Sequence, residues 1–255
     1  MLFFLIWAVC IGIIPNPDHS NPAIWRFFAE AIPLIITIIL NYIFVFFDKV
    51  DMKLSLKSDL GKNLLLSVVV AFIWIGLSLF VINLMGGISI DSKNKVNHLA
   101  IWFTSLFLNT MMQELMFRGY LYQMLKKVDI KLGVFISTAL FTFLHGGALE
   151  AGLIPVLNVI TMSLFMTVVL EYTDSLWPPI IIHYIWNAIG GLLFGTVSLA
   201  EDYMNMYNMN FHGSKIITGG AVKIEGSIVV LILNIILIIV FLKLIKKRKL
   251  IENIK

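Results

Sequence analysis

Three pairs of polar or aromatic residues interrupt the apolar stretches of this sequence. In each pair the two residues lie four positions apart: Glu114 with Arg118, Phe141 with His145, and His183 with Asn187. Residues at this spacing share one face of a helix. Ionisable groups inside apolar segments are costly and usually face a partner or a water-filled cavity. The three pairs are therefore candidates for one common site.

The side chains of these pairs indicate hydrolytic chemistry. A carboxylate or an imidazole can take a proton from water, and an imidazolium can return it to a leaving amine. The amide of an asparagine or the N–H of a histidine can stabilise an oxyanion. No serine, cysteine or threonine lies among the pairs in a position to attack, so the sequence favours an activated water.

Other interpretations of the same residues stay open. Two histidines and a carboxylate, here His145, His183 and Glu114, could hold a divalent metal such as zinc with one free position. The sequence has no H-E-x-x-H helix, and the ligands would come from three separate helices. No other cofactor is expected. Taken singly, each pair also has a structural interpretation as an ion pair, a helix cap or an interhelical hydrogen bond.

The composition is that of a polytopic membrane protein. Of the 255 residues 59% are hydrophobic and 13% are charged, against about 25% charged residues in soluble domains. The mean hydropathy is +0.93. The net charge of +4 comes from Lys and Arg beside apolar runs, where they set orientation, so no nucleic-acid partner is expected. The single cysteine, Cys10, excludes an internal disulfide.

Apolar runs separated by loop signals predict an all-α, polytopic transmembrane helical bundle of 7–8 spans. Residues 1–14 would reach only about 21 Å as a helix, less than the roughly 30 Å of a hydrocarbon core. They are expected to form a partial or tilted first span. The full spans are expected at 24–47, 63–85, 99–125, 132–148, 152–170, 176–194 and 226–245.

Charge and depth then place the candidate residues. The loops 48–62 and 126–131 and the tail 246–255 are basic and fall on one side, which predicts a multi-pass protein of the cell membrane with a cytoplasmic C-terminus. At the rise of an α-helix, Glu114 and His145 lie roughly 18 and 21 Å from the cytoplasmic ends of their helices. His183 and Asn187 lie roughly 13 and 20 Å from theirs. The three pairs are thus expected at similar depth.

The three motifs resemble those of the CAAX-protease and bacteriocin-processing (CPBP, or Abi) family of intramembrane proteases. That family shows E-E-x-x-x-R, F-x-x-x-H and H-x-x-x-N/D, each on its own helix. Here they read Gln113-Glu114-Leu-Met-Phe-Arg118, Phe141-Thr-Phe-Leu-His145 and His183-Tyr-Ile-Trp-Asn187. The resemblance covers roughly 97–195 as a catalytic core, between N-terminal helices at 1–96 and an external loop, last helix and basic tail at 196–255.

This resemblance implies an intramembrane endopeptidase that uses activated water on a peptide or membrane-protein substrate in the lipid bilayer. Peptide maturation and bacteriocin self-immunity are among the roles of its bacterial members. The implied catalytic roles are these: Glu114 as base or base-orienter, His145 with the water, and His183 with Asn187 on the oxyanion side. Arg118, Gln113 and Phe141 are the implied supporting residues.

One departure from the family pattern is important. The family's first glutamate, which is thought to activate the water, is Gln113 here, and glutamine is not a base. Neighbouring helical residues differ by about 100° in direction, so Glu114 can replace it only where the helix is rotated or distorted. The alternative is a catalytically silent membrane scaffold or regulator. The sequence does not predict an oligomeric state.

Overall fold

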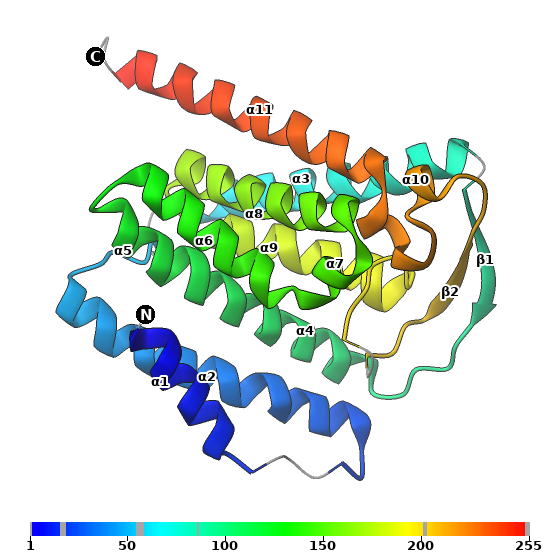
Figure 1. Cartoon of the computed structure of the whole chain (residues 1–255), viewed down its shortest axis with the longest axis horizontal. Helices are drawn as coiled ribbons and strands as arrows, with labels where there is room; N and C mark the ends of the chain where they lie inside the picture. Colours follow the sequence, from blue (N-terminus) through cyan, green and yellow to red (C-terminus); the bar gives the residue numbers. More distant parts are fainter. Residues whose placement is uncertain (1, 16–18, 55–58, 86, 201–202, 253–255) are drawn as a thin grey trace.

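The N-terminal helices of the protein lie along one side of a helical bundle (Figure 1). The computed structural model describes residues 2–15, 19–54, 59–85, 87–200 and 203–252, so parts of the basic loop 48–62 and of the basic tail lie outside the described residues. The helices here are α1 (Leu2–Ile13) and α2 (Pro22–Asp48), while α3 (Leu60–Leu84) lies among the other helices of the bundle (Figure 1). Residues 1–14 were expected to form a partial or tilted span, and α1, a short apolar helix, packs along α2. Its Phe3 is buried and stacks on Tyr120.

The motif-bearing helices form the middle of the bundle. They are α4 (Leu99–Glu114), the π-helix η1 (Leu115–Tyr122), α5 (Gln123–Lys126), α6 (Ile130–Leu144), α7 (Gly146–Ala151), α8 (Leu153–Thr173), α9 (Trp177–Ile185) and the π-helix η2 (Trp186–Leu193). The segments α4, η1 and α5 follow one another without a break, as do α9 and η2. The helix expected at 132–148 ends at Leu144, because the backbone of His145 (φ −93°, ψ 53°) leaves the helical region.

The remaining elements form one end of the molecule and its outer helix. A two-stranded antiparallel sheet pairs β1 (Ile88–Lys93) with β2 (Tyr207–Phe211), with Ile88 opposite Phe211 and a bulge between Ile90 and Ser92. This sheet was not expected, since both strands come from polar loops. It is followed by α10 (Lys215–Thr218), the 3₁₀-helix η3 (Gly220–Gly226) and α11 (Ile228–Glu252).

The expected number of spans is not confirmed. Four helical segments of the described chain are long and apolar enough to cross a membrane: Pro22–Asp48, Leu60–Leu84, Leu153–Thr173 and Gly220–Leu250. The all-α class and a membrane location are supported, but α6 and α9 are shorter, with 15 and 9 residues. The long segment from α4 to α5 is divided by its π-helix.

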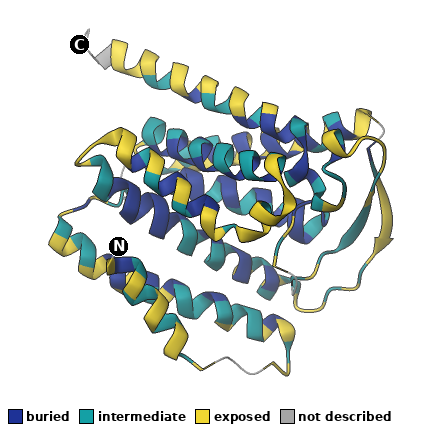
Figure 2. Cartoon of the chain, viewed as in Figure 1, coloured by how far each residue is buried: buried dark blue, intermediate teal, exposed yellow. Residues whose placement is uncertain are grey.

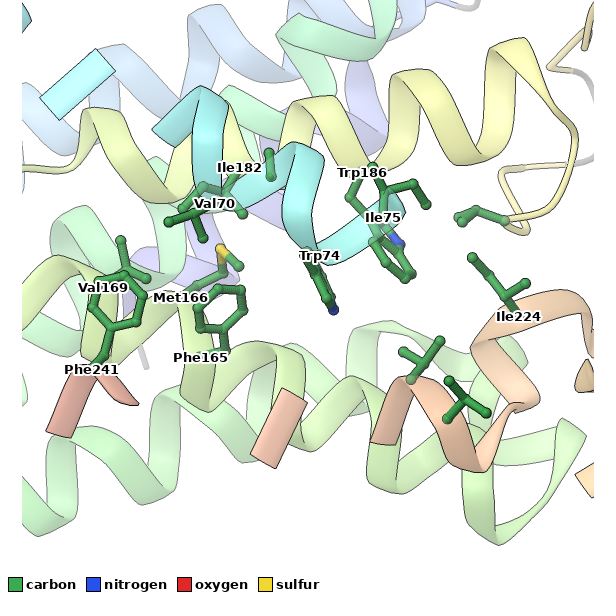
Figure 3. Close-up of a cluster of buried hydrophobic side chains, with 14 of the residues drawn as sticks. Val70, Trp74, Ile75, Phe165, Met166, Val169, Ile182, Trp186, Ile224 and Phe241 are labelled. Atoms are coloured by element: carbon green, nitrogen blue, oxygen red, sulfur yellow. The ribbon is translucent and has the colours of Figure 1, made fainter. Parts of the chain in front are cut away.

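Buried aromatic residues fix the helix that carries the third motif. The ring of Trp186, in η2, stacks on Trp74 of α3 with 3.8 Å between centroids, and Phe165 of α8 packs edge-on against Trp74 (Figure 3). Burial is concentrated in η1 and α9, whereas α1, α2 and α11 carry many exposed residues (Figure 2). The helical segment that carries His183 and Asn187 is thus held against α3 through Trp186.

Trp74→Ala is expected to lower the free energy of unfolding by about 3–5 kcal/mol, since it removes the stacking partner of Trp186 and leaves a cavity. Thermal unfolding of the purified protein in detergent measures this loss. Phe72→Ala is the matched control, because Phe72 lies on the same helix and is 55% exposed. Equal shifts for the two variants would contradict a specific role of the stacked pair.

Candidate active site

The side chain of Glu114 joins the first and third motifs. It is fully buried at the end of α4, and its Oε1 accepts hydrogen bonds from Nη1 of Arg118 at 3.3 Å and from Nδ1 of His183 at 2.9 Å. The π-helix η1 begins at the next residue, and its wider turn (i→i+5 hydrogen bonds) alters the direction of the following side chains. π-helical segments occur often at functional sites. The helix is therefore distorted from the residue after Glu114 onward.

Arg118 connects the first motif to two further helices. Its side chain is fully buried, and Nη2 donates to Oγ of Ser163 at 2.8 Å and to the Ser163 carbonyl oxygen at 3.2 Å. The guanidinium lies 4.1 Å from the centre of the Phe141 ring, a cation–π contact. Ser163 Oγ in turn donates to Oγ1 of Thr138 at 3.3 Å. Arg118 thus balances the charge of Glu114 and fixes α6 and α8 around it.

Phe141 lies between the polar residues of all three motifs. Besides the guanidinium of Arg118, its ring faces the ring of His145 at 4.3 Å and that of His183 at 6.2 Å between centroids. Nδ1 of His145 lies 2.8 Å from the carbonyl oxygen of Phe141, one helical turn earlier. The structure therefore brings Arg118, His145 and His183 around one aromatic ring.

The hydrogen-bond partners assign the same tautomer to both histidines. A carboxylate and a backbone carbonyl only accept hydrogen bonds, so Nδ1 of His183 and Nδ1 of His145 both carry hydrogen. In the neutral rings Nε2 then holds the lone pair. Each histidine thus offers a basic nitrogen.

Asn187 and Gln113 differ from the other candidates in their surroundings. Asn187, one turn beyond His183, is half-buried and forms no hydrogen bond to the described part of the chain. Its amide is free to bind a substrate. Gln113 donates from Nε2 to Oδ1 of Asn109 at 2.8 Å, on its own helix. Gln113 therefore does not join Glu114 in binding His183.

A three-ligand metal site does not fit these residues. Within the described residues no three His, Cys, Asp or Glu side chains are grouped so that they could hold a metal ion. Oε1 of Glu114 is occupied by His183 and Arg118. Its Oε2 is buried and accepts no hydrogen bond within the described residues, so this oxygen and the two Nε2 atoms of the histidines stay unoccupied. No step through a metal follows from this donor set.

An apolar cavity of about 630 Å³ adjoins the polar cluster instead of containing it. It lies along α6, α7 and α8, and Thr138, Thr142, Leu149 and Ile160 belong to its lining. Thr138 accepts the hydrogen bond from Ser163, so the cavity and the Arg118 site share this wall. Phe135 and Phe143, which also line it, are 73% and 69% exposed. The cavity therefore opens to the outer surface of the bundle.

Sequence reasoning missed several residues of this cluster. Ser163, Thr138 and Asn109 are single polar residues in apolar helices, which common packing also explains. Glu30, which binds Asn109, did have a signal: it lies four residues after Arg26 inside the apolar run 24–47. This is the same spacing that singled out Glu114 and Arg118.

Comparison with known families supports the resemblance. Residues 95–189 match the family model of type II CAAX prenyl endopeptidase Rce1-like proteins, and the match includes all three motifs. The predicted resemblance to the CAAX protease family is thereby confirmed for this segment. No curated protein and no solved structure shows a significant match to the chain.

Proposed function

We propose that this protein is an intramembrane endopeptidase. The premise is that residues 95–189 form an Rce1-like CAAX endopeptidase domain. The protein hydrolyses a peptide bond in a membrane-associated peptide or protein with an activated water. The buried hydrogen bond between Glu114 and His183 carries this proposal, because it joins two motifs from separate helices. Such a carboxylate–imidazole pair orients a base and stabilises its protonated form.

The proposed reaction uses the two free imidazole nitrogens. Nε2 of His183 takes a proton from water while Nε2 of His145 accepts its second hydrogen bond, and the water oxygen adds to the peptide carbonyl carbon. The amide of Asn187 donates to the resulting oxyanion. The imidazolium of His183 then protonates the amine as the C–N bond breaks. His183 is thus assigned to the water, whereas the resemblance implied the oxyanion side.

Three observations support a membrane-embedded substrate and a defined orientation. The apolar cavity beside Thr138 borders the polar cluster from the outer surface of the bundle. Basic residues gather at one end of the bundle, where Lys127 donates to carbonyls of the α2 terminus and Arg248 to Tyr172. We propose that this end and the C-terminus are cytoplasmic. The segments α4–α5, α6 and α9–η2 would then cross together with the four longer helices.

Gln113 favours a second candidate function. The amide of this residue cannot act as a base, and it pairs with Asn109 away from His183. A protein of this kind could bind a membrane partner at the same cluster without cutting it. This silent scaffold predicts no turnover, and the two functions are separated by one assay.

The assay is cleavage of a quenched peptide panel by the purified protein in detergent, with and without a chelator. We expect the wild type to cleave, His183→Ala to lose cleavage and the chelator to have no effect. His212→Ala is the matched control, because His212 lies beyond β2 and contacts Ser89 of the sheet. A folded wild type that cleaves no peptide contradicts the protease and supports the scaffold. Chelator-sensitive cleavage contradicts the metal-free step.

A further inference from the structure

A second buried carboxylate lies outside the three motifs. Glu30, on α2, is 4% exposed. Its Oε2 accepts a hydrogen bond from Nδ2 of Asn109 at 2.7 Å, and its Oε1 forms an ion pair with Nη2 of Arg26 at 3.0 Å. The hydroxyl of Tyr203, from the loop before β2, donates to Oε1 at 3.3 Å. This network links the outer helix α2 to the motif helix α4.

The charge of Glu30 fixes the orientation of two amides in succession. As half of an ion pair with Arg26, Glu30 only accepts hydrogen bonds, so Asn109 must present its NH₂ group to it. The carbonyl oxygen of Asn109 then points to Gln113, which must present its own NH₂ group. The amide oxygen of Gln113 is consequently left on the opposite side. This Oε1 is buried and accepts no hydrogen bond within the described residues.

We propose that Glu30 is a positioning residue that, through Asn109, locks the amide of Gln113 with its oxygen available as a hydrogen-bond acceptor. The amide oxygen of Gln113 can thereby accept a hydrogen bond as a carboxylate oxygen would, but it carries no negative charge. The functional part of this inference rests on the proposed protease, since the acceptor would orient the water or a substrate N–H. The family has a carboxylate at position 113. In this chain, Gln113 is instead linked to the carboxylate of Glu30 through two successive hydrogen bonds, both made by Asn109.

This network is matched to glutamine at position 113. With Gln113→Glu alone, the new carboxylate would face the carbonyl oxygen of Asn109, because the NH₂ group of Asn109 is directed to Glu30, and it would be buried with too few donors. With Glu30→Gln added, both hydrogen bonds of Asn109 can reverse: Asn109 donates to the carboxylate at 113 and accepts from the amide at 30. The two substitutions should therefore compensate each other.

Thermal unfolding in detergent tests whether Glu30 fixes the orientation of the Gln113 amide, and it does not require activity. The proteins compared are the wild type, Gln113→Glu, Glu30→Gln and the double variant. Gln113→Glu is expected to lower Tm by roughly 5–10 °C. The double variant is expected to recover at least half of the summed loss of the two single variants. Additive losses would overturn the proposed lock, because independent residues show no coupling.

Steady-state cleavage kinetics test the positioning role. Glu30→Gln is expected to lower kcat roughly 10-fold to 100-fold with little change in KM. Tyr203→Phe is the matched control: it removes a partner of Oε1 but leaves the bond from Asn109 to Oε2, so kcat should stay within about two-fold. Equal kcat for the two variants would overturn positioning by Glu30. A wild type without turnover contradicts both the proposed protease and the positioning role in catalysis. The Tm values of the four variants still test whether Glu30 fixes the orientation of the Gln113 amide.

Discussion

Glu114→Gln is expected to lower the kcat of peptide cleavage by about 10³–10⁴-fold and to change KM only a few-fold. A glutamine can present its NH₂ group to Nδ1 of His183, which favours the tautomer with hydrogen on Nε2. That nitrogen would then no longer accept the proton of water. The loss falls on kcat because the carboxylate acts on the histidine, not on the bound peptide. Steady-state kinetics with the quenched peptide measures both constants.

Glu150→Gln is the matched control for this carboxylate-to-amide change. Glu150 lies on α7 and is exposed, so its kcat should equal that of the wild type. Size-exclusion chromatography shows that each variant retains its fold. More than a tenth of the wild-type kcat in a folded Glu114→Gln variant would contradict the assignment of Glu114 as the residue that orients His183.

Arg118→Met is expected to have a large effect on stability. It removes the positive charge that balances Glu114 in a fully buried cluster, and it removes both hydrogen bonds to Ser163. Breaking a buried pair by removing one partner costs about 3–5 kcal/mol. For a protein of this size that corresponds to a Tm loss of roughly 10 °C, which thermal unfolding in detergent measures.

Two further variants test whether the Tm loss of Arg118→Met comes from the unbalanced charge of Glu114 or from replacing any charged residue by methionine. Adding Glu114→Gln to Arg118→Met removes the unbalanced carboxylate and should restore part of the lost Tm. Lys62→Met is the control, because Lys62 pairs with Asp59 at the surface and should shift Tm little. A Tm of Arg118→Met equal to that of Lys62→Met would show that the buried pair contributes no more than a surface one.

Much of the site could be predicted because it depends on spacing. Apolar runs set the helices of the bundle to within a few residues, and a spacing of four set the shared faces of Glu114 with Arg118 and of His183 with Asn187. The rise per residue then predicted that His145 and His183 could lie near Glu114, and in the structure His183 binds Glu114 and both histidines face Phe141.

The rest depends on features that have no local signature in the sequence. Gly119 lies within the π-helix that follows Glu114, but a single glycine in an apolar run does not specify a π-helix. The π-helix also divides a helix that was expected to be one span, and the expected number of spans is not confirmed. The partner of Arg118, Ser163, is 45 residues away, and such a contact follows only from the packing of α8. Glu30 could have been found by the rule applied to Glu114.

The central claim is that Glu114 acts through His183 as one unit in peptide hydrolysis. A double-mutant cycle on kcat/KM measures this directly, with wild type, Glu114→Gln, His183→Ala and the double variant assayed on the same quenched peptide. Residues that act as a unit give losses that do not multiply. We therefore predict that the double variant is no slower than His183→Ala alone. Losses that multiply, or a folded wild type without turnover, would contradict the account.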